Sequence, residues 1–195
     1  MIPLIWVLIG FTLGSLPFSL WIGKLALNLD IRDIGDGNPG GFNVWKTGSR
    51  FWAIIAILLD GFKGAIPVGL AHSVYGINDW ILLPVALAPL AGHIFSPWLK
   101  FRGGKGLSTS FGIWLGLTLW LGPTVFGLSL FIWKKVFKSD RSAVAAGFLT
   151  LSVVLLLLGF SPVMVTISSA NLALVYWAYG KNYSGEKDER VIGTI

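Results

Sequence analysis

The stretch that decides the fold class runs from Phe51 to Leu70 and reads FWAIIAILLDGFKGAIPVGL. Its 20 residues are uncharged except for Asp60 and Lys63, and an α-helix needs about 20 apolar residues to cross a bilayer. The whole chain of 195 residues is 54% hydrophobic and 12% charged, whereas a soluble domain carries about 25% charged residues. The composition therefore predicts an all-α integral membrane protein with a single transmembrane domain over residues 1–195 and no soluble domain.

Seven apolar segments can be distinguished, and each predicts one membrane-spanning helix. They cover 2–23, 51–70, 80–99, 107–120, 123–137, 143–159 and 162–179. The first segment has no basic region before it and no obvious cleavage site, so we expect a retained helix and not a signal peptide. The stretch 107–137 is ambiguous, because it could form one long span or two short spans broken at Leu121, Gly122 and Pro123.

The distribution of cations decides between one span and two. All of the 15 Lys and Arg residues except Lys63 lie in the stretches 24–50, 100–106, 134–141 and 181–190, and the intervening loops hold none. Cytoplasmic loops of membrane proteins carry an excess of Lys and Arg, and only seven spans put all these stretches on one side. The sequence thus predicts seven spans in the cytoplasmic membrane, with the N-terminus outside and the C-terminus in the cytoplasm. The net charge of +6 then reflects topology and contact with anionic membrane lipids, and we expect no nucleic-acid partner.

Two glycine-rich loops on the predicted cytoplasmic side could bind an anion. The first covers 30–46 and reads DIRDIGDGNPGGFNVWK. Successive turns in such a loop can point several backbone N–H groups into one concavity. The alternative is a flexible linker between two spans. The polar residues Asn38, Asn43, Lys46 and Arg50 favour the binding site, because a linker does not need them.

The second loop covers 101–109 and reads FRGGKGLST, a pattern that resembles a phosphate cradle. Glycines let a backbone approach phosphate oxygens closely, Lys105 supplies a mobile charge, and a predicted helix begins directly afterwards. The spacing is not that of a Walker A loop, and no strand precedes it. Cations and glycine loops at a membrane surface together indicate a phosphorylated or otherwise anionic substrate whose partner or product is a lipid.

The remaining polar residues have both a structural and a functional interpretation. Asp60 and Lys63 are neighbours on one helix face, where a charged pair can hold two helices together or contact a substrate. His93 could be a structural residue or a base, and Ser142 could cap a helix or belong to the site. The chain has no cysteine and only two histidines, on opposite sides of the predicted bilayer, so we expect no metal and no other cofactor.

Five blocks of the sequence carry a further signal. They read GSLPF at 14–18, DIRDIGDGNPGGFNV at 30–44, DGFKG at 60–64, GHIF at 92–95 and FRGGKG at 101–106. Together they resemble the bacterial acyl-phosphate-dependent glycerol-3-phosphate acyltransferases over nearly the whole chain. The resemblance implies that an acyl group passes from acyl phosphate to glycerol 3-phosphate in phospholipid synthesis, giving 1-acylglycerol 3-phosphate, or lysophosphatidic acid, and phosphate. It also suggests a soluble acyl-phosphate synthase as a partner.

The resemblance implies roles for individual residues as well. The catalytic residues would be Lys105, Ser142, Asn182 and His93. The substrate-binding residues would be Gly103, Gly104, Gly106, Arg102, Asn38, Asn43, Lys46 and Arg50. In this interpretation Lys105 and the glycine backbone hold the leaving phosphoryl group, and Lys46 and Arg50 hold the phosphate of the acceptor.

The chain departs from the family pattern at four positions. Asp36 replaces a serine, Phe42 a threonine, Lys46 an arginine and Tyr179 a histidine. Asp36 puts a carboxylate into a loop that should attract phosphate, and Lys46 loses the bidentate geometry of arginine. These departures leave a second interpretation open, a divergent non-catalytic paralogue that acts as a small membrane transporter or a lipid-binding protein.

Overall fold

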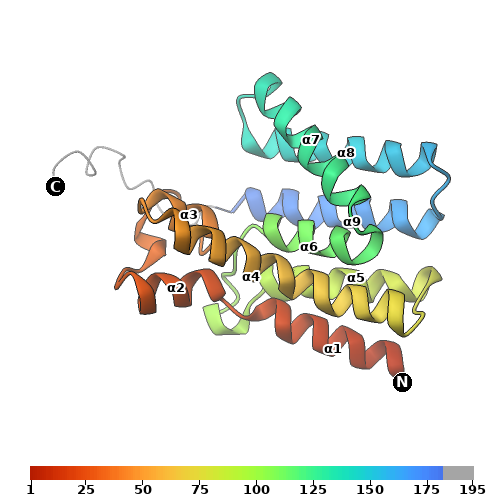
Figure 1. Ribbon diagram of the computed structural model, residues 1–195, viewed down its shortest axis with the longest axis horizontal. Helices are drawn as coiled ribbons and strands as arrows, with labels where there is room; N and C mark the ends of the chain where they lie inside the picture. The colour runs from red at the N-terminus through yellow and green to blue at the C-terminus, as the bar shows by residue number, and fades with distance from the viewer. Residues whose placement is uncertain (182–195) are drawn as a thin grey trace.

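The computed structural model describes residues 1–181, and every regular element in that range is helical. In chain order the elements are α1 (Ile2–Ser15), α2 (Phe18–Ala26), η1 (Ile31–Asp33), α3 (Gly41–Lys46), α4 (Arg50–Gly69), η2 (Leu70–Val74), α5 (Asp79–Ile94), η3 (Pro97–Leu99), α6 (Leu107–Thr118), α7 (Leu121–Val136), α8 (Asp140–Leu157) and α9 (Pro162–Tyr179). Long helices pack lengthwise, with α2 and α3 at one end of the molecule and the N-terminus at the other (Figure 1). The predicted all-α fold is confirmed.

Four helical segments of the described chain are long and apolar enough to cross a membrane. They are Ile2–Ala26, Arg50–Val74, Asp79–Leu99 and Asp140–Leu157. Large apolar side chains on their outer surfaces are exposed, as expected where a protein meets lipid. Helices α6 and α7, with 12 and 16 residues, are shorter than the roughly 20 residues that one span needs. The number of spans and the orientation of the chain ends stay predictions.

The first apolar segment forms two helices, where the sequence predicted one. Pro17 lacks an N–H and disfavours the helical conformation at the residue before it, and the chain is extended at Leu16. The carbonyl oxygen of Leu16 accepts a hydrogen bond from Lys63 Nζ at 3.0 Å, and Lys63 also pairs with Asp60 at 2.7 Å. The second oxygen of Asp60 accepts a hydrogen bond from Ser19 on α2 at 2.6 Å. The buried Asp60–Lys63 pair therefore connects α4 to the break between α1 and α2. This arrangement favours the structural role of the pair, in which it holds helices together.

The ambiguous stretch 107–137 also forms two helices, α6 and α7. The break lies at Leu119 and Trp120, slightly before the position that the sequence predicted, and Leu119 has a φ of 51°. Pro123 lies in the first turn of α7. The N–H groups of a first turn have no partner within the helix, so the missing N–H of proline costs no helical hydrogen bond there. The Thr118 hydroxyl accepts the N–H of Gly122 at 2.9 Å and so bridges the two helices.

Helix α6 lies close against α4 because both present glycines at the contact. A Cβ atom at Gly112 would overlap the carbonyl oxygen of Gly61, and one at Gly64 would lie 2.5 Å from the carbonyl oxygen of Thr109. Small residues allow two helix backbones in a membrane to approach in this way. Since the FRGGKG loop leads directly into α6, this contact also fixes the position of that loop.

Gly112→Ala should therefore destabilise the protein by about 1–3 kcal/mol, the usual cost of overpacking a tight contact. The added methyl group can be accommodated only if the backbone of α4 or α6 shifts. The measurement is the thermal unfolding midpoint of the protein in detergent. Gly127→Ala on α7 is the matched control, because its Cβ would lie 3.5 Å from the Phe111 ring, an ordinary contact distance. Equal midpoints for the two variants would contradict this account of the α4–α6 contact.

Candidate active site

A cavity of about 820 Å³ lies beside the FRGGKG loop and extends along α4, α6 and α7. Its polar part includes Asp36, Asn38, Lys46, His93, Lys105 and Tyr179. Its apolar part includes Ile57, Leu58, Phe62, Phe111, Leu115, Pro123 and Leu130. A cavity with one charged part and one apolar part suits a ligand that has an anionic head and a hydrocarbon chain.

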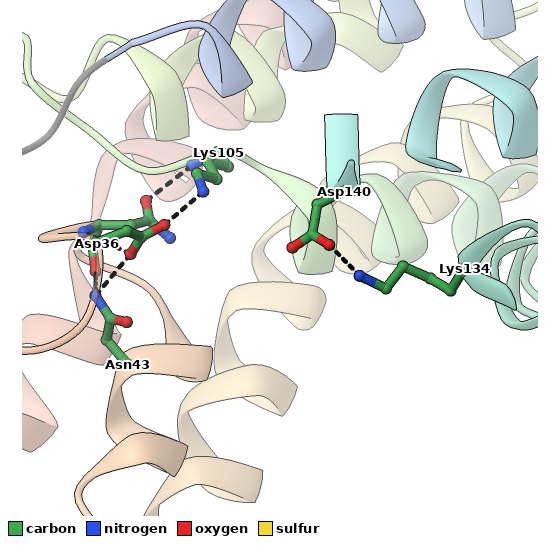
Figure 2. A network of polar contacts seen from close by, with 6 residues as sticks. Asp36, Asn43, Lys105, Lys134 and Asp140 are labelled. Atoms are coloured by element: carbon green, nitrogen blue, oxygen red, sulfur yellow. Dashed lines mark hydrogen bonds and ion pairs between the residues drawn. The ribbon is translucent and has the colours of Figure 1, made fainter. Parts of the chain in front are cut away.

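Lys105 lies at the centre of a polar network in this cavity (Figure 2). Its ammonium group contacts Asp36 Oδ2 at 2.5 Å, and its backbone N–H donates to Asn38 Oδ1 at 3.2 Å. The other carboxylate oxygen, Asp36 Oδ1, accepts hydrogen bonds from Asn43 Nδ2 at 3.0 Å and from the Asn38 N–H at 3.2 Å. The two glycine-rich loops, which are far apart in the sequence, therefore meet at one point.

The charge on Asp36 is stabilised by this network. Burial by itself raises the pKa of the Asp36 carboxyl, but the hydrogen bond and the positive charge of Lys105 outweigh burial and lower the pKa below its ordinary value. Earlier in the same loop, the side-chain hydrogen bond from Arg32 lowers the pKa of Asp30 to about 2. Both carboxylates are therefore ionised at neutral pH, and Lys105 faces a full negative charge.

The three glycines of the FRGGKG loop differ in what they do. The N–H groups of Gly103 and Gly104 donate to the carbonyl oxygens of Ile94 and His93 at 3.1 and 3.2 Å. A Cβ atom at either glycine would overlap His93, so these two residues pack the loop onto the end of α5 and position Lys105. Gly106 has a φ of 82°, a conformation that favours glycine, and directly precedes α6. Gly106 lines the cavity, whereas Gly103 and Gly104 do not.

Two aromatic side chains of the cavity contact the FRGGKG loop. The Tyr179 ring, at the end of α9, lies 4.7 Å from Lys105 Nζ, within the range of a cation–π contact. The His93 ring lies against Gly104 and also lines the cavity. Ser142 lies near the start of α8 between Asp140 and Val144, two residues that line the cavity. Asn182 falls outside the described residues.

Two of the predicted binding residues lie away from this cavity. Arg102 lines a second cavity of about 1180 Å³ together with Arg32, Lys100 and Lys181. Arg50 is exposed at the start of α4, and its guanidinium group lies 5.9 Å from the Trp45 ring. Lys46 does line the first cavity, with its ammonium group 5.7 Å from the Phe42 ring.

Sequence reasoning missed two charged residues of the cavity, Lys134 and Asp140. They form an ion pair between the end of α7 and the start of α8, to one side of Lys105 (Figure 2). Both lie within the basic stretch 134–141, which was interpreted only as a topology signal. A lone acidic residue among four cations was the one sign in the sequence of a pair at this position.

Comparison with known proteins gives the family. Residues 4–185 match the family described as glycerol-3-phosphate acyltransferase. The chain belongs to the glycerol-3-phosphate acyltransferase family. A glycerol-3-phosphate acyltransferase of Parasynechococcus marenigrum (strain WH8102) is 36% identical over 176 residues, which is 89% of this chain and 81% of the relative. One from Rhodopseudomonas palustris (strain HaA2) is 36% identical over 180 residues, 90% of this chain and 87% of the relative.

Two solved structures of a glycerol-3-phosphate acyltransferase share the fold. Both are crystal structures of PlsY (YgiH), described as an integral membrane glycerol 3-phosphate acyltransferase. The glycerol 3-phosphate form has a TM-score of 0.79 and 27% identity, and covers 92% of this chain and 88% of that one. The lysophosphatidic acid form has a TM-score of 0.78 and 25% identity, and covers 93% and 90%. The chain is thus an acyltransferase and a multi-pass membrane protein, and the transporter or lipid-binding alternative is not favoured.

Proposed function

We propose that this acyltransferase moves an acyl group from acyl phosphate to glycerol 3-phosphate, giving 1-acylglycerol 3-phosphate and inorganic phosphate. The observation that carries the proposal is the single cavity in which Lys105 and Lys46 lie beside a long apolar groove. The reaction needs such a site, because two phosphorylated molecules must meet while a hydrocarbon chain stays out of water. The related PlsY structures are described as holding glycerol 3-phosphate and lysophosphatidic acid, the acceptor and the product of this reaction.

The leaving phosphoryl group is best held by Lys105 and the start of α6. No side chain caps the N-terminus of α6, and Gly106, Leu107 and Ser108 line the cavity there. The first N–H groups of a helix have no partner within the helix, and the helix dipole adds partial positive charge. Phosphate groups bind well at such positions. A mobile ammonium group beside a fixed set of N–H donors can follow phosphate as it departs.

Lys46 is best placed to hold the phosphate of the acceptor. It lines the cavity, and within residues 1–181 no ion pair to a carboxylate forms at its ammonium group. Asn43, Ser142 and Asn182 are proposed to orient the acceptor hydroxyl groups. The Oδ1 atom of Asn43 is buried and has no hydrogen-bond partner in the described structure, and Asn43 does not line the cavity, so its contact with an acceptor hydroxyl requires the side chain to turn toward the cavity.

In the proposed reaction a hydroxyl oxygen of glycerol 3-phosphate attacks the acyl carbonyl carbon. The bond from that carbon to the phosphate oxygen breaks, and the electron pair leaves with phosphate. The hydroxyl proton goes to a phosphate oxygen or to His93, which lines the cavity. The protein's contribution is to hold two anions in contact and to offset their repulsion. The chain has no cysteine, and we propose direct transfer without a covalent intermediate.

We further propose that the chain has seven spans, with the N-terminus outside and this cavity facing the cytoplasm of the cell. The clustering of cations in alternate loops supports that orientation. The short helices α6 and α7 would then lie where the bilayer is locally thinner. A soluble acyl-phosphate synthase could deliver its product directly to this face.

The experiment that tests the function is phosphate release by the purified protein in detergent, supplied with acyl phosphate. We expect release that depends on glycerol 3-phosphate, together with a lysophosphatidic acid product. In parallel reactions, acyl phosphate is replaced by acyl-CoA or by acyl carrier protein that carries an acyl group. Neither of these donors should give lysophosphatidic acid. Release without an acceptor would indicate a hydrolase, and no release from folded protein would contradict the proposal.

A further inference from the structure

We propose that Asp36 is a built-in anion that competes with the phosphate of a ligand for Lys105, and that it sets how tightly the site binds phosphorylated molecules. The inference rests on the proposed function only for the identity of the ligand. In this role Asp36 determines specificity by weakening the binding of phosphate, whereas Lys105 and Lys46 strengthen it.

The contacts of Asp36 are those of a bound anion. Its two oxygens accept hydrogen bonds from Lys105 Nζ at 2.5 Å, Asn43 Nδ2 at 3.0 Å and the Asn38 N–H at 3.2 Å (Figure 2). An ammonium group, an amide and a backbone N–H are the kinds of donor that also hold phosphate oxygens. The Asp36 carboxylate therefore uses the donors that a phosphate in this cavity would need.

The loop around Asp36 permits the carboxylate to leave these donors. The Asp36 side chain is 45% exposed, whereas that of Lys105 is 20% exposed. Asp36 lies between Gly35 and Gly37, which have φ values of 58° and 72°. Glycine costs little strain in that region and gives the backbone more freedom than other residues have. A ligand phosphate can therefore displace the carboxylate into solvent while Lys105 stays in the cavity.

The charges of the cavity show what the displacement changes. Three lysines and three aspartates line it, namely Lys46, Lys105, Lys134, Asp36, Asp60 and Asp140. Asp60 pairs with buried Lys63, and Asp140 pairs with Lys134. Asp36 pairs with Lys105. Among the described residues, Lys46 is therefore the one lysine of the cavity that forms no ion pair. A neutral residue at position 36 leaves Lys105 unopposed and removes a negative charge that repels phosphate.

The test compares Asp36→Asn and Asp36→Ser with Asp30→Asn in the purified, full-length protein. Asp30→Asn is the matched control, because it removes the same charge from an aspartate of the same loop that pairs with a cation, Arg32, but lines the second cavity. The first measurement is binding of inorganic phosphate, followed as the phosphate-dependent rise of the thermal unfolding midpoint. The second measurement is the KM for glycerol 3-phosphate and for acyl phosphate, each varied separately.

Both Asp36 variants should bind inorganic phosphate about tenfold more tightly, which corresponds to about 1.4 kcal/mol of binding free energy, because no carboxylate then has to be displaced from Lys105. The substrate whose KM falls is the one whose phosphate lies at Lys105. Asp30→Asn should leave both quantities unchanged, and Lys105→Ala in the Asp36→Asn protein should abolish the gain. Using two replacements at position 36 keeps the test informative if one of them fails to fold.

Unchanged phosphate binding in a folded Asp36 variant would overturn the inference, and so would an equal gain in Asp30→Asn, which would reveal only a general charge effect. Tighter phosphate binding in the Asp36 variants without turnover in any variant would support the inference and count against the proposed function. The two ideas can therefore fail separately.

Discussion

Lys105→Ala is expected to lower the rate of acyl transfer by about 10²–10³-fold, the usual loss when one preorganised charge stabiliser is removed. Lys105 is the lysine at the centre of the polar network, and it lies beside the uncapped start of α6. Without its ammonium group, the N–H dipoles at the start of α6 remain to stabilise the negative charge that develops on the leaving phosphate, and among the described residues Lys46 is the one cavity lysine without an ion pair. The measurement is phosphate release at saturating acyl phosphate and glycerol 3-phosphate.

The control for this prediction is Lys100→Ala. Lys100 belongs to the same basic stretch but lines the second cavity, so its removal should leave turnover unchanged. Thermal unfolding of both variants checks that each protein is folded. Near-normal turnover in folded Lys105→Ala, or an equal loss in Lys100→Ala, would contradict the assignment of Lys105 to the reacting phosphate.

Lys63→Met is expected to destabilise the protein by about 3–5 kcal/mol, because removing one partner of a buried ion pair leaves the other charge uncompensated. Asp60 and Lys63 have side chains only 3% and 2% exposed, and the lysine also donates to the Leu16 carbonyl oxygen at the α1–α2 break. Methionine keeps most of the side-chain volume and removes the charge. The measurement is the free energy of unfolding in detergent.

Two comparisons make this prediction specific. The double variant Asp60→Asn with Lys63→Met should recover part of the loss, since no charge is then left buried. Lys134→Met breaks an exposed pair with Asp140 and should cost at most about 1 kcal/mol. A Lys63→Met protein as stable as the Lys134→Met protein would show that the Asp60–Lys63 pair does not hold α4 to the helix break.

Much of the fold class and the position of the site could be predicted from the sequence. The lengths of the apolar segments predicted the long helices. The positions of the cation-rich loops predicted which segments meet around Lys105. The break at Pro17 could not be predicted, because Pro67, Pro84 and Pro89 also lie in apolar segments and stay inside helices. At Pro17 the helix ends, and Lys63 satisfies the carbonyl oxygen of Leu16, which is left without a helical partner by the break.

The details of the site depended on contacts that no local pattern contains. Asp36 and Lys105 are 69 positions apart, and their pairing follows from how two irregular loops pack. Gly103 and Gly104 were interpreted as phosphate-binding residues, because a sequence does not distinguish a glycine that admits a ligand from one that admits a neighbouring backbone. In the structure their N–H groups are bonded to carbonyl oxygens at the end of α5, which accounts for both glycines as packing residues, and their role in binding substrate stays a prediction.

Helix α6 connects the two halves of the ligand site. Its first residues lie at Lys105, and its later residues Phe111 and Leu115 form part of the apolar groove. From Leu107 to Leu115 the helix rises about 12 Å, and the groove then meets Trp120 and Pro123 at the turn into α7. In the proposed reaction, an acyl chain whose phosphate binds at the start of α6 lies along this groove, so the distance to the α6–α7 corner limits the chain length that fits. We therefore expect changes at that corner to alter the chain lengths that enter membrane lipids while leaving the chemistry at the head group unchanged.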